Sequence, residues 1–461
     1  MATQELVGRV ASAVANPGLH QAVARSVDRH SYAALAALTP EVREIYKARA
    51  RAARLRSVRH MAELAAQFIA QAESHGIIVH TADDAAEAVR IVAEIAKSHG
   101  VRRIVKSKSM ATEEVELNAH LGAEGMSVLE TDLGEYIVQL AGQKPSHIVA
   151  PCLHMTRDEI AALFSREAGR QIATDTPSLT AFARERLREE FRLADLGISG
   201  GNFLVASEGA LVMVTNEGNG RMCTTLPKVH VALVGIEKLV RDFADLADAV
   251  RILPVASTGQ LITSYVSIIR RPAQSGEEGP QEVHIVLMDS GRSEILGSRY
   301  EEVLACIRCG ACLDICPVYR QTGGHAYGSV YSGPIGAVLT PLLRAEPSAQ
   351  ALPFLSSLCG ACTDVCPVGI HLHEHLVALR ARAVARGVAF PAESGAFRGL
   401  RRAWTPARRY RLTRRLMRGA LRLGGGARQL RAWTAGRSLP RVAARPVADR
   451  LRAEGLIDEE R

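Results

Sequence analysis

The sequence has no long apolar segment and no export signal. No stretch approaches the roughly 20 apolar residues of a membrane-spanning helix. The opening residues, MATQELVGRVASAVANPG, carry charges where a signal peptide would be continuously apolar. We therefore expect a cytoplasmic chain. In that compartment thiols stay reduced, and clustered cysteines bind metal more often than they form disulfides.

Nucleotide-binding signatures are missing as well. No G-x-G-x-x-G follows a strand-like segment, and the chain holds no Walker loop. A Rossmann site for nicotinamide or flavin is therefore not predicted. Oxidation of an organic acid needs a hydride or two-electron acceptor. If this protein takes part in such a reaction, it would relay electrons or use a cofactor bound in another way.

The composition is that of a globular protein with two or three domains. The 461 residues are 47% apolar and 23% charged, which suffices for a sizeable core. Strand-like and helix-like segments alternate, with strands expected at 76–80, 101–108, 126–131 and 146–152. This alternation predicts right-handed crossovers and a mostly parallel sheet flanked by helices.

We divide the chain into four regions. Residues 1–60 form an N-terminal helical segment, and the pattern from Thr39 to Gly76 predicts a helix that begins at Thr-Pro and ends at glycine. An α/β domain covers 61–292, with closing strands expected within 262–272 and 281–289. A helical, cysteine-rich domain covers 293–390. Residues 391–461 form a basic extension.

The basic extension concentrates the net charge of +9, because arginines are dense from Arg398 to Arg450 while the rest is nearly balanced. Such a segment favours an anionic membrane surface, nucleic acid or an acidic partner. Trp404 and Trp433 among the arginines suit an interfacial helix, although a solvated extension is the commoner outcome. Peripheral contact with the inner face of the membrane is the alternative that stays open, and nucleic-acid binding is not expected.

Seven of the nine cysteines lie in two related motifs. The first is C-x2-C-x2-C-x3-C-P, and the second repeats it with a serine, Ser356, at its first position. The first spacing is that of bacterial ferredoxins, in which the fourth cysteine binds the other cluster. We therefore assign cluster one to Cys306, Cys309, Cys312 and Cys366, and cluster two to Cys316, Cys359 and Cys362.

The fourth ligand of cluster two stays open. A three-iron cluster, a four-iron cluster with serine or water at one iron, and a ligand from a partner are the alternatives. Structural zinc is disfavoured because zinc sites use two separated pairs of ligands rather than runs of four and three. Cys152 and Cys223 lie outside the motifs and are expected to be buried structural residues.

The sequence resembles one known family from about residue 15 to the basic extension. The cysteine region resembles the iron–sulfur subunit of the bacterial L-lactate utilization system, and KSKSMATEEVELNAHL (106–121), ETDLGEYIVQLAGQKPSHIVAPCLH (130–154) and NEGNGRMCTTLPKVHV (216–231) agree. The family shares the serine at position 356. One departure is Ala206-Ser207-Glu208-Gly209, where the family has Ala-Glu-Thr-Gly.

This resemblance implies a lactate-utilization (LUD) domain of the sugar-phosphate isomerase and CoA-transferase class, fused to a helical two-cluster ferredoxin-like domain. It implies two 4Fe–4S clusters and a chain that carries electrons while L-lactate is oxidised to pyruvate. The implied partners are two companion lactate-utilization subunits and an electron donor or acceptor, either a protein or a quinone.

The α/β domain offers weak candidates for binding an anion. Lys106 and Lys108 lie at the end of a strand and before a helix, where such folds hold phosphates and carboxylates, but two solvated lysines are the plainer interpretation. Arg221, in NEGNGR, would pair with a carboxylate or with Glu217.

Other polar residues of this domain have ordinary explanations. Near Glu130 and Glu135, Asp132 is expected to cap a helix. His147, His154 and His230 are expected to be satisfied or exposed histidines rather than catalytic bases.

Three functions are therefore compared. The first is an electron-transfer subunit of a lactate-oxidising system, which the cysteines favour. The second is a catalytic oxidoreductase that binds the organic acid in its own α/β domain. The third, a redox-sensing regulator that binds nucleic acid through the arginines, would show steeply salt-dependent binding.

Overall fold

The structure is a computed structural model that describes residues 2–388, 391–422, 443 and 445–456. By internal contacts the chain forms two compact units, Met1–Val388 and Ala389–Arg461. The first unit contains all nine cysteines and both sheets. The site is therefore built within that unit.

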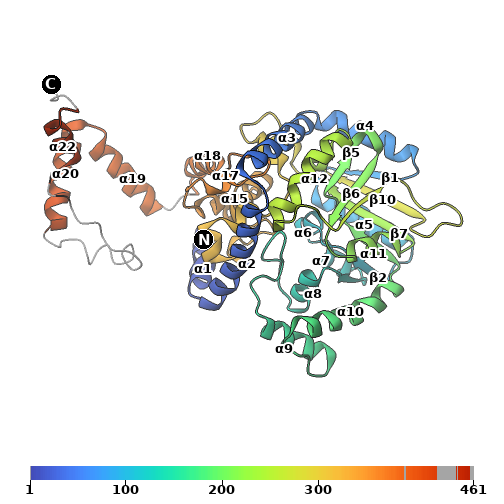
Figure 1. Ribbon diagram of the computed structural model, residues 1–461. Coiled ribbons are helices and arrows are strands. Elements are labelled where there is room, and N and C mark those ends of the chain that lie inside the picture. Colours follow the sequence, from blue (N-terminus) through green and yellow to red (C-terminus); the bar gives the residue numbers. More distant parts are fainter. Residues whose placement is uncertain (1, 389–390, 423–442, 444, 457–461) are drawn as a thin grey trace. The chain divides into compact units, whose positions relative to one another are not determined.

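A six-stranded parallel sheet forms the centre of the α/β region (Figure 1). The strand order is β1-β10-β7-β4-β2-β3, and every pairing is parallel. The strands are β1 (Ile78–Ala82), β2 (Arg103–Lys106), β3 (Ser127–Glu130), β4 (Leu196–Ser199), β7 (Val229–Gly235) and β10 (Glu282–Met288). The predicted mostly parallel α/β fold is confirmed.

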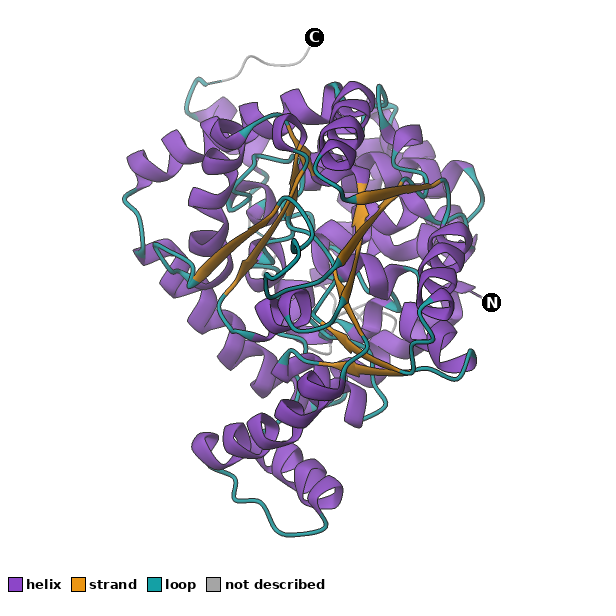
Figure 2. Ribbon diagram, turned by 90° about the vertical axis from the view of Figure 1, so that its right-hand side faces the viewer, coloured by secondary structure: helices purple, strands orange, loops and turns teal. Residues whose placement is uncertain are grey.

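Helices cover both faces of this sheet because its central strands are apolar on both sides (Figure 2). On one face α5 (Ala85–Ser98) and α7 (Leu117–Ala123) pack against Ile104, Ile198 and Val231. On the other, α4 (Met61–Ser74) packs with Ala232, Val234 and Ile285. The helices α8 (Leu133–Leu140), α9 (Arg157–Ala168) and α10 (Thr176–Leu193) form a further cluster.

A smaller four-stranded sheet lies beside the main one in the chain's core, with the order β8-β5-β6-β9. Its strands are β8 (Leu239–Val240), β5 (Phe203–Val205), β6 (Ala210–Thr215) and β9 (Tyr265–Ile269). The β5–β6 hairpin turns at Gly209, whose φ of 55° favours glycine. Residues 206–209, where the sequence differs from the family pattern, form this turn. Glu208 in this turn pairs with Arg270 at 3.0 Å.

Two helical expectations need correction. The segment from Thr39 to Gly76 is two helices, α3 (Pro40–Arg59) and α4, because the backbone leaves the helical region at His60. Residues 110–125, whose apolar spacing favours a single helix, also split, into α6 (Met110–Glu114) and α7, at Glu116 with a φ of 53°. Helical periodicity continues across both breaks, so the pattern alone did not reveal them.

The strand expected at 146–152 is wrong, because this segment is an irregular loop. Its polar groups bond to the cysteine region instead of to a neighbouring strand. Tyr319 donates to the Ser146 carbonyl at 2.8 Å, and the amide of Gly324 donates to Ser146 Oγ at 3.2 Å. A side chain at Gly324 would collide with the Ser146 carbonyl. The loop is therefore a joint between the α/β and cysteine-rich regions.

The cysteine-rich region is helical. It comprises α13 (Ala311–Asp314), α14 (Pro317–Thr322), α15 (Gly333–Leu343), α16 (Pro347–Ala351), α17 (Ala361–Asp364) and α18 (Leu372–Ala385). Its core is continuous with α2 (Pro17–Ala36) and α3, through Val23, Val27 and Ala50. α1 (Ala2–Val14) also packs here, and its Arg9 donates to the Ala326 carbonyl at 3.2 Å.

Arg54 joins α3 to both regions. Its fully buried guanidinium donates to the Leu239 carbonyl at 2.6 Å, to that of Leu304 at 3.2 Å and to those of Glu237 and Ala305. Charge-assisted bonds of this kind are among the stronger ones in proteins. The N-terminal helices are thus built into the same core as the cysteine region.

The second unit contains α19 (Pro391–Trp404), α20 (Ala407–Arg422) and α22 (Val447–Ala453). Trp404 meets Tyr410 edge to face, with ring centroids 6.3 Å apart. Trp433 lies outside the described residues. Across the described part of the chain, no helix combines the length and apolar character needed to cross a bilayer.

Candidate metal centre and the adjoining cavity

The two cysteine motifs fold into the same backbone shape. In the first, Arg308 and Gly310 have φ values of 59° and 82°, and α13 follows. In the second, Leu358 and Gly360 have 56° and 84°, and α17 follows. The repeated left-handed residues turn each loop so that successive cysteines face one side. The near-repetition in sequence is therefore a repetition in structure.

The thiols form two neighbouring groups, and each group contains one cysteine from the other motif. All nine cysteines are free. Burial and then the charges of Cys306 and Cys366 raise the pKa of Cys309. Burial and then the charges of Cys316 and Cys359 raise the pKa of Cys362 to about 12. Cys366 therefore lies with the first loop, and Cys316 lies with the second.

The two groups adjoin at Cys312. Burial raises the pKa of Cys312 first, then the charges of Cys309, Cys306 and Cys362. Thiols this buried and crowded ionise only when positive charge enters, as iron supplies. The donor set therefore fits iron–sulfur clusters, while the residue-by-residue assignment of ligands stays a prediction.

Backbone amides point at the sulfurs, as expected for atoms that carry negative charge when iron is bound. Arg308 N donates to Cys306 Sγ at 3.4 Å, and Ile370 N donates to Cys366 Sγ at 3.3 Å. Tyr319 N donates to Cys316 Sγ at 3.5 Å. Leu358 N donates to Ser356 Oγ at 3.1 Å, so the serine oxygen occupies the equivalent place in the second loop.

The groups differ in their exposure. Cys309, Cys312 and Cys366 of the first group are buried, and Cys306 is half-buried. In the second group Cys359 is exposed. The second loop is held from outside by Arg380, which donates to the Ser356 carbonyl at 2.6 Å. The second group is thus the one nearer to solvent.

Helix α3 supports the second motif from the N-terminal region. Arg51 donates to the Val368 carbonyl at 3.4 Å and pairs with Glu302 at 2.8 Å. Lys47 donates to the Asp364 carbonyl at 3.3 Å. Residues far apart in the chain therefore set the position of Cys366.

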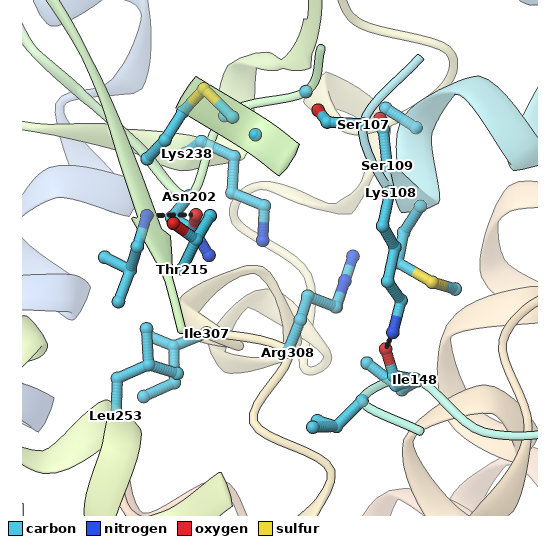
Figure 3. Close-up of a pocket in the computed structure, with 18 of the residues that line it drawn as sticks. Ser107, Lys108, Ser109, Ile148, Asn202, Thr215, Lys238, Leu253, Ile307 and Arg308 are labelled. Carbon is cyan, nitrogen blue, oxygen red and sulfur yellow. Dashed lines mark hydrogen bonds between the residues drawn. The ribbon is translucent and has the colours of Figure 1, made fainter. Parts of the chain in front are cut away.

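A cavity of about 260 Å³ lies at the carboxyl edge of the parallel sheet (Figure 3). The residues that follow β2, β4 and β7 line it, and the first cysteine loop closes it through Ile307 and Arg308. This edge is where open α/β sheets bind ligands. A small-molecule site thus borders the loop that carries Cys306 and Cys309.

Three cations of the cavity converge on one carboxylate. Arg292, Arg308 and Lys238 approach the single carboxylate of Glu237 at 2.6, 3.3 and 3.8 Å. Burial opposes ionisation of Glu237, but these cations lower its pKa to about 2. Burial, followed by the charge of Arg308, lowers the pKa of Lys238 to about 7. Glu114 supplies a second acid, 2.8 Å from Arg292.

The two candidate lysines have different surroundings. Lys108 lines the cavity and donates to the Ile148 carbonyl (Figure 3). Lys106 does not line it, because its fully buried amino group is paired with Glu130 at 2.8 Å and Glu113 at 3.1 Å. These acids keep the pKa of Lys106 raised against the opposing effect of burial.

Arg221 also lies outside the cavity lining, although Asn219 and Gly220 belong to it. Its exposed guanidinium stacks on Tyr265, 5.2 Å from the ring centroid. Glu217 lines the cavity, and burial raises its pKa. The structure therefore separates Arg221 from Glu217, which were considered as a pair.

The expected ordinary roles are confirmed for Asp132 and Cys223, and only in part for the other residues. Asp132 caps α8, accepting from Glu135 N at 3.1 Å. His230 Nε2 lies 2.8 Å from Ser199 Oγ and His154 Nε2 lies 2.7 Å from Gln143 Oε1. The Nδ1 atom of each ring is buried without a hydrogen-bond partner among the described residues, so these two histidines are satisfied only in part. Cys223 is fully buried beside Thr131, while Cys152 is only half-buried.

His147 has a structural role at the joint. Its Nε2 lies 3.2 Å from Asp314 Oδ1 in α13, and its Nδ1 accepts from Val149 N at 3.1 Å. Sequence reasoning treated this histidine singly and missed Lys238, Arg308, Ser107 and Thr215, which line the cavity. Only the position of Arg308 between two cysteines could have drawn attention to it.

Family comparisons agree with this two-part site. Residues 65–288 match the LUD domain model, and residues 302–370 match the 4Fe-4S dicluster domain model. The cysteines of 302–370 thus belong to a domain that holds two 4Fe–4S clusters. A crystal structure of a DUF162 family protein from Deinococcus radiodurans covers 50% of this chain and 98% of its own, at 15% identity. Its TM-score of 0.28 does not establish a common fold.

Curated relatives match over most of their length. Lactate utilization protein B of Geobacillus kaustophilus is 42% identical over 382 residues, which cover 81% of this chain and 80% of the relative. Lactate utilization protein B of Shouchella clausii is 42% identical over 406 residues, covering 85% of each chain. With this identity and coverage, the chain belongs to the lactate utilization protein B family.

Proposed function

We propose that this chain is the electron-transfer subunit of a system that oxidises L-lactate to pyruvate. The observation that carries the proposal is the crossed pairing of thiols, with Cys366 beside Cys306 and Cys309, and Cys316 beside Cys359 and Cys362. Clusters bound there supply one-electron redox chemistry. The family membership supports lactate as the source of electrons.

The ligand assignment belongs to this proposal. Cys306, Cys309, Cys312 and Cys366 would hold the first cluster, and Cys316, Cys359 and Cys362 the second, with Ser356 at the fourth position. The exposure of Cys359 favours the second site as the docking place for an electron partner. The partner would be a carrier protein or a quinone, and companion lactate-utilization subunits would complete the system.

The basic second unit supports a peripheral role at the inner face of the membrane. Its helix α20 carries repeated arginines with exposed Leu412, Leu416 and Met417. Such a helix suits an anionic surface. Deletion of residues 391–461 should then lower binding to anionic vesicles while leaving the iron content unchanged.

A catalytic role for the chain itself is the second candidate, favoured by the cavity beside the first cysteine loop. Anaerobically reconstituted full-length protein distinguishes the two. With L-lactate alone, the relay predicts unchanged cluster absorbance, and bleaching only after the companion subunits are added. Bleaching by L-lactate without partners would instead establish catalysis by this chain. Iron and sulfide counts on the same samples verify that both clusters are present.

A further inference from the structure

The cavity at the sheet edge contains polar groups that have no partner in the described protein. Ser107 Oγ, Thr215 Oγ1 and Arg308 Nη1 are buried and unpaired, and all three residues line the cavity. Ser107 is 3% exposed and the Arg308 side chain 10%. Unpaired buried polar groups carry a cost in stability. Their gathering at one cavity indicates a ligand that completes their hydrogen bonds.

The charge of the cavity points to an anion. Lys238 and Arg308 extend their amino and guanidinium groups toward the middle of the cavity (Figure 3). Glu237 is shared by these cations and Arg292, and the Cys306 side chain lies near Lys238 and Arg308. Arg308 is fixed in this direction because it stacks on Tyr331, 4.7 Å from the ring centroid. Asp132 and Glu217 lie near Lys108, which leaves the Lys238–Arg308 side the more positive.

Size and apolar lining narrow the class of anion. The volume of about 260 Å³ is below the roughly 300–1,000 Å³ of sites for drug-sized ligands. Apolar side chains of Ile307, Leu253 and Met213 line the same space. A bare phosphate has no group to place against them, whereas a short organic acid has an alkyl group. The unpaired hydroxyls of Ser107 and Thr215 lie on different sides of the cavity (Figure 3), so one would bond the carboxylate and the other a hydroxyl or oxo group.

We propose that this cavity binds a short-chain hydroxy or oxo carboxylate. Lys238 and Arg308 hold its carboxylate, while Ser107 and Thr215 bond its oxygens from different sides of the cavity. The inference deepens the proposed function and rests on it only for the choice of L-lactate and pyruvate as probes. The same pocket would place the bound acid against the loop of Cys306 and Cys309.

Calorimetry on the full-length protein with its clusters, under anaerobic conditions, tests the site. L-lactate or pyruvate should bind saturably, and lactamide, which lacks the charge, should not. Inorganic phosphate should bind at least roughly tenfold more weakly, since its lack of an alkyl group forfeits the apolar contacts. Phosphate binding as tightly as the acids would overturn the carboxylate assignment, and absence of saturable binding by any probe would overturn the site.

Hydroxyl removal provides variants that should still fold. Ser107→Ala and Thr215→Val each delete an oxygen with no partner in the protein, so the urea midpoint should stay or rise while affinity falls roughly tenfold. The matched control is Tyr136→Phe, which deletes another buried, unpaired hydroxyl away from the cavity and should leave affinity unchanged. Unaltered affinity in both cavity variants would contradict the proposal.

Different results would refute the electron-relay proposal and the acid-binding proposal. If iron counts and dithionite reduction show both clusters but no acid binds, the cavity site is wrong and the relay stands. If acids bind but the companion subunits cannot reduce the clusters with L-lactate, the relay is wrong and the site stands. A Lys238→Met variant that keeps its iron and loses affinity at least roughly tenfold would place the carboxylate at that amino group.

Discussion

Ser356 occupies in the second cysteine loop the position that Cys306 occupies in the first. Cys306 Sγ accepts from Arg308 N at 3.4 Å, and Ser356 Oγ accepts from Leu358 N at 3.1 Å. Arg308 and Leu358 share a left-handed backbone conformation. The loop geometry is therefore kept while the donor atom changes from sulfur to oxygen.

Replacing this serine should change the second cluster alone. Ser356→Cys restores a soft thiolate, and added negative charge at the cluster favours its oxidised state. We expect a more negative reduction potential for one of two signals in an EPR-monitored titration. Ser357→Cys, at the exposed neighbouring position, is the control and should move neither. Two unchanged potentials in Ser356→Cys would show that position 356 does not face the cluster.

The crossed arrangement predicts which signal each cysteine variant removes. Cys366→Ser should disturb the cluster whose potential is insensitive to Ser356→Cys, since Cys366 lies with Cys306 and Cys309. Cys316→Ser should disturb the sensitive one, since Cys316 lies with Cys359 and Cys362. EPR of the reduced variants measures this directly. The reverse pattern would mean that each motif completes its own site.

Lys106 should matter for stability and not for binding an acid. Lys106→Met leaves Glu130 and Glu113 without their buried cation, and breaking such a group costs about 3–5 kcal/mol. Urea unfolding measures the loss. Lys97→Met removes an exposed lysine 2.8 Å from Glu124 and should cost about 0–1 kcal/mol. If Lys106→Met lost L-lactate binding without losing stability, Lys106 would belong to the ligand site.

Stability should fall as the pH drops from 7 to 5. Burial lowers the pKa of His230 to about 3, and burial with the nearby His325 lowers that of His154 to about 4. Both are neutral when folded but take up protons near pH 6.5 when unfolded, so acid favours unfolding between about pH 6.5 and 4. The apparent urea midpoint at fixed incubation time should follow this direction.

Two variants assign that pH dependence. His154→Gln should reduce the loss between pH 7 and 5 by roughly 1–2 kcal/mol. His60→Gln replaces a histidine whose side chain is 65% exposed and should leave the slope as it is. An equal slope in wild type and His154→Gln would mean that this histidine contributes nothing to the acid sensitivity.

The regular parts of the chain were predictable because their patterns are local. Alternation of strands and helices predicted the parallel sheet, whose six strands the structure shows. The loop at 146–152 could not be predicted, because its apolar residues look like a strand in isolation. The side chain of Tyr319 and the backbone of Gly324, more than 160 residues away, engage its polar groups instead.

For the site, the amino-acid sequence alone determined the donor atoms and the kind of cofactor, since cysteine spacing and the terminal Cys-Pro are local and chemically specific. It also marked position 356 as different. Tertiary structure alone decided that Lys106 is an internal ion pair, that Lys108 faces a cavity, and that Arg308 links this cavity to the first cysteine loop. The physical reason is that burial and pairing depend on which strand ends and loops meet, and contacts between residues far apart in the chain settle that.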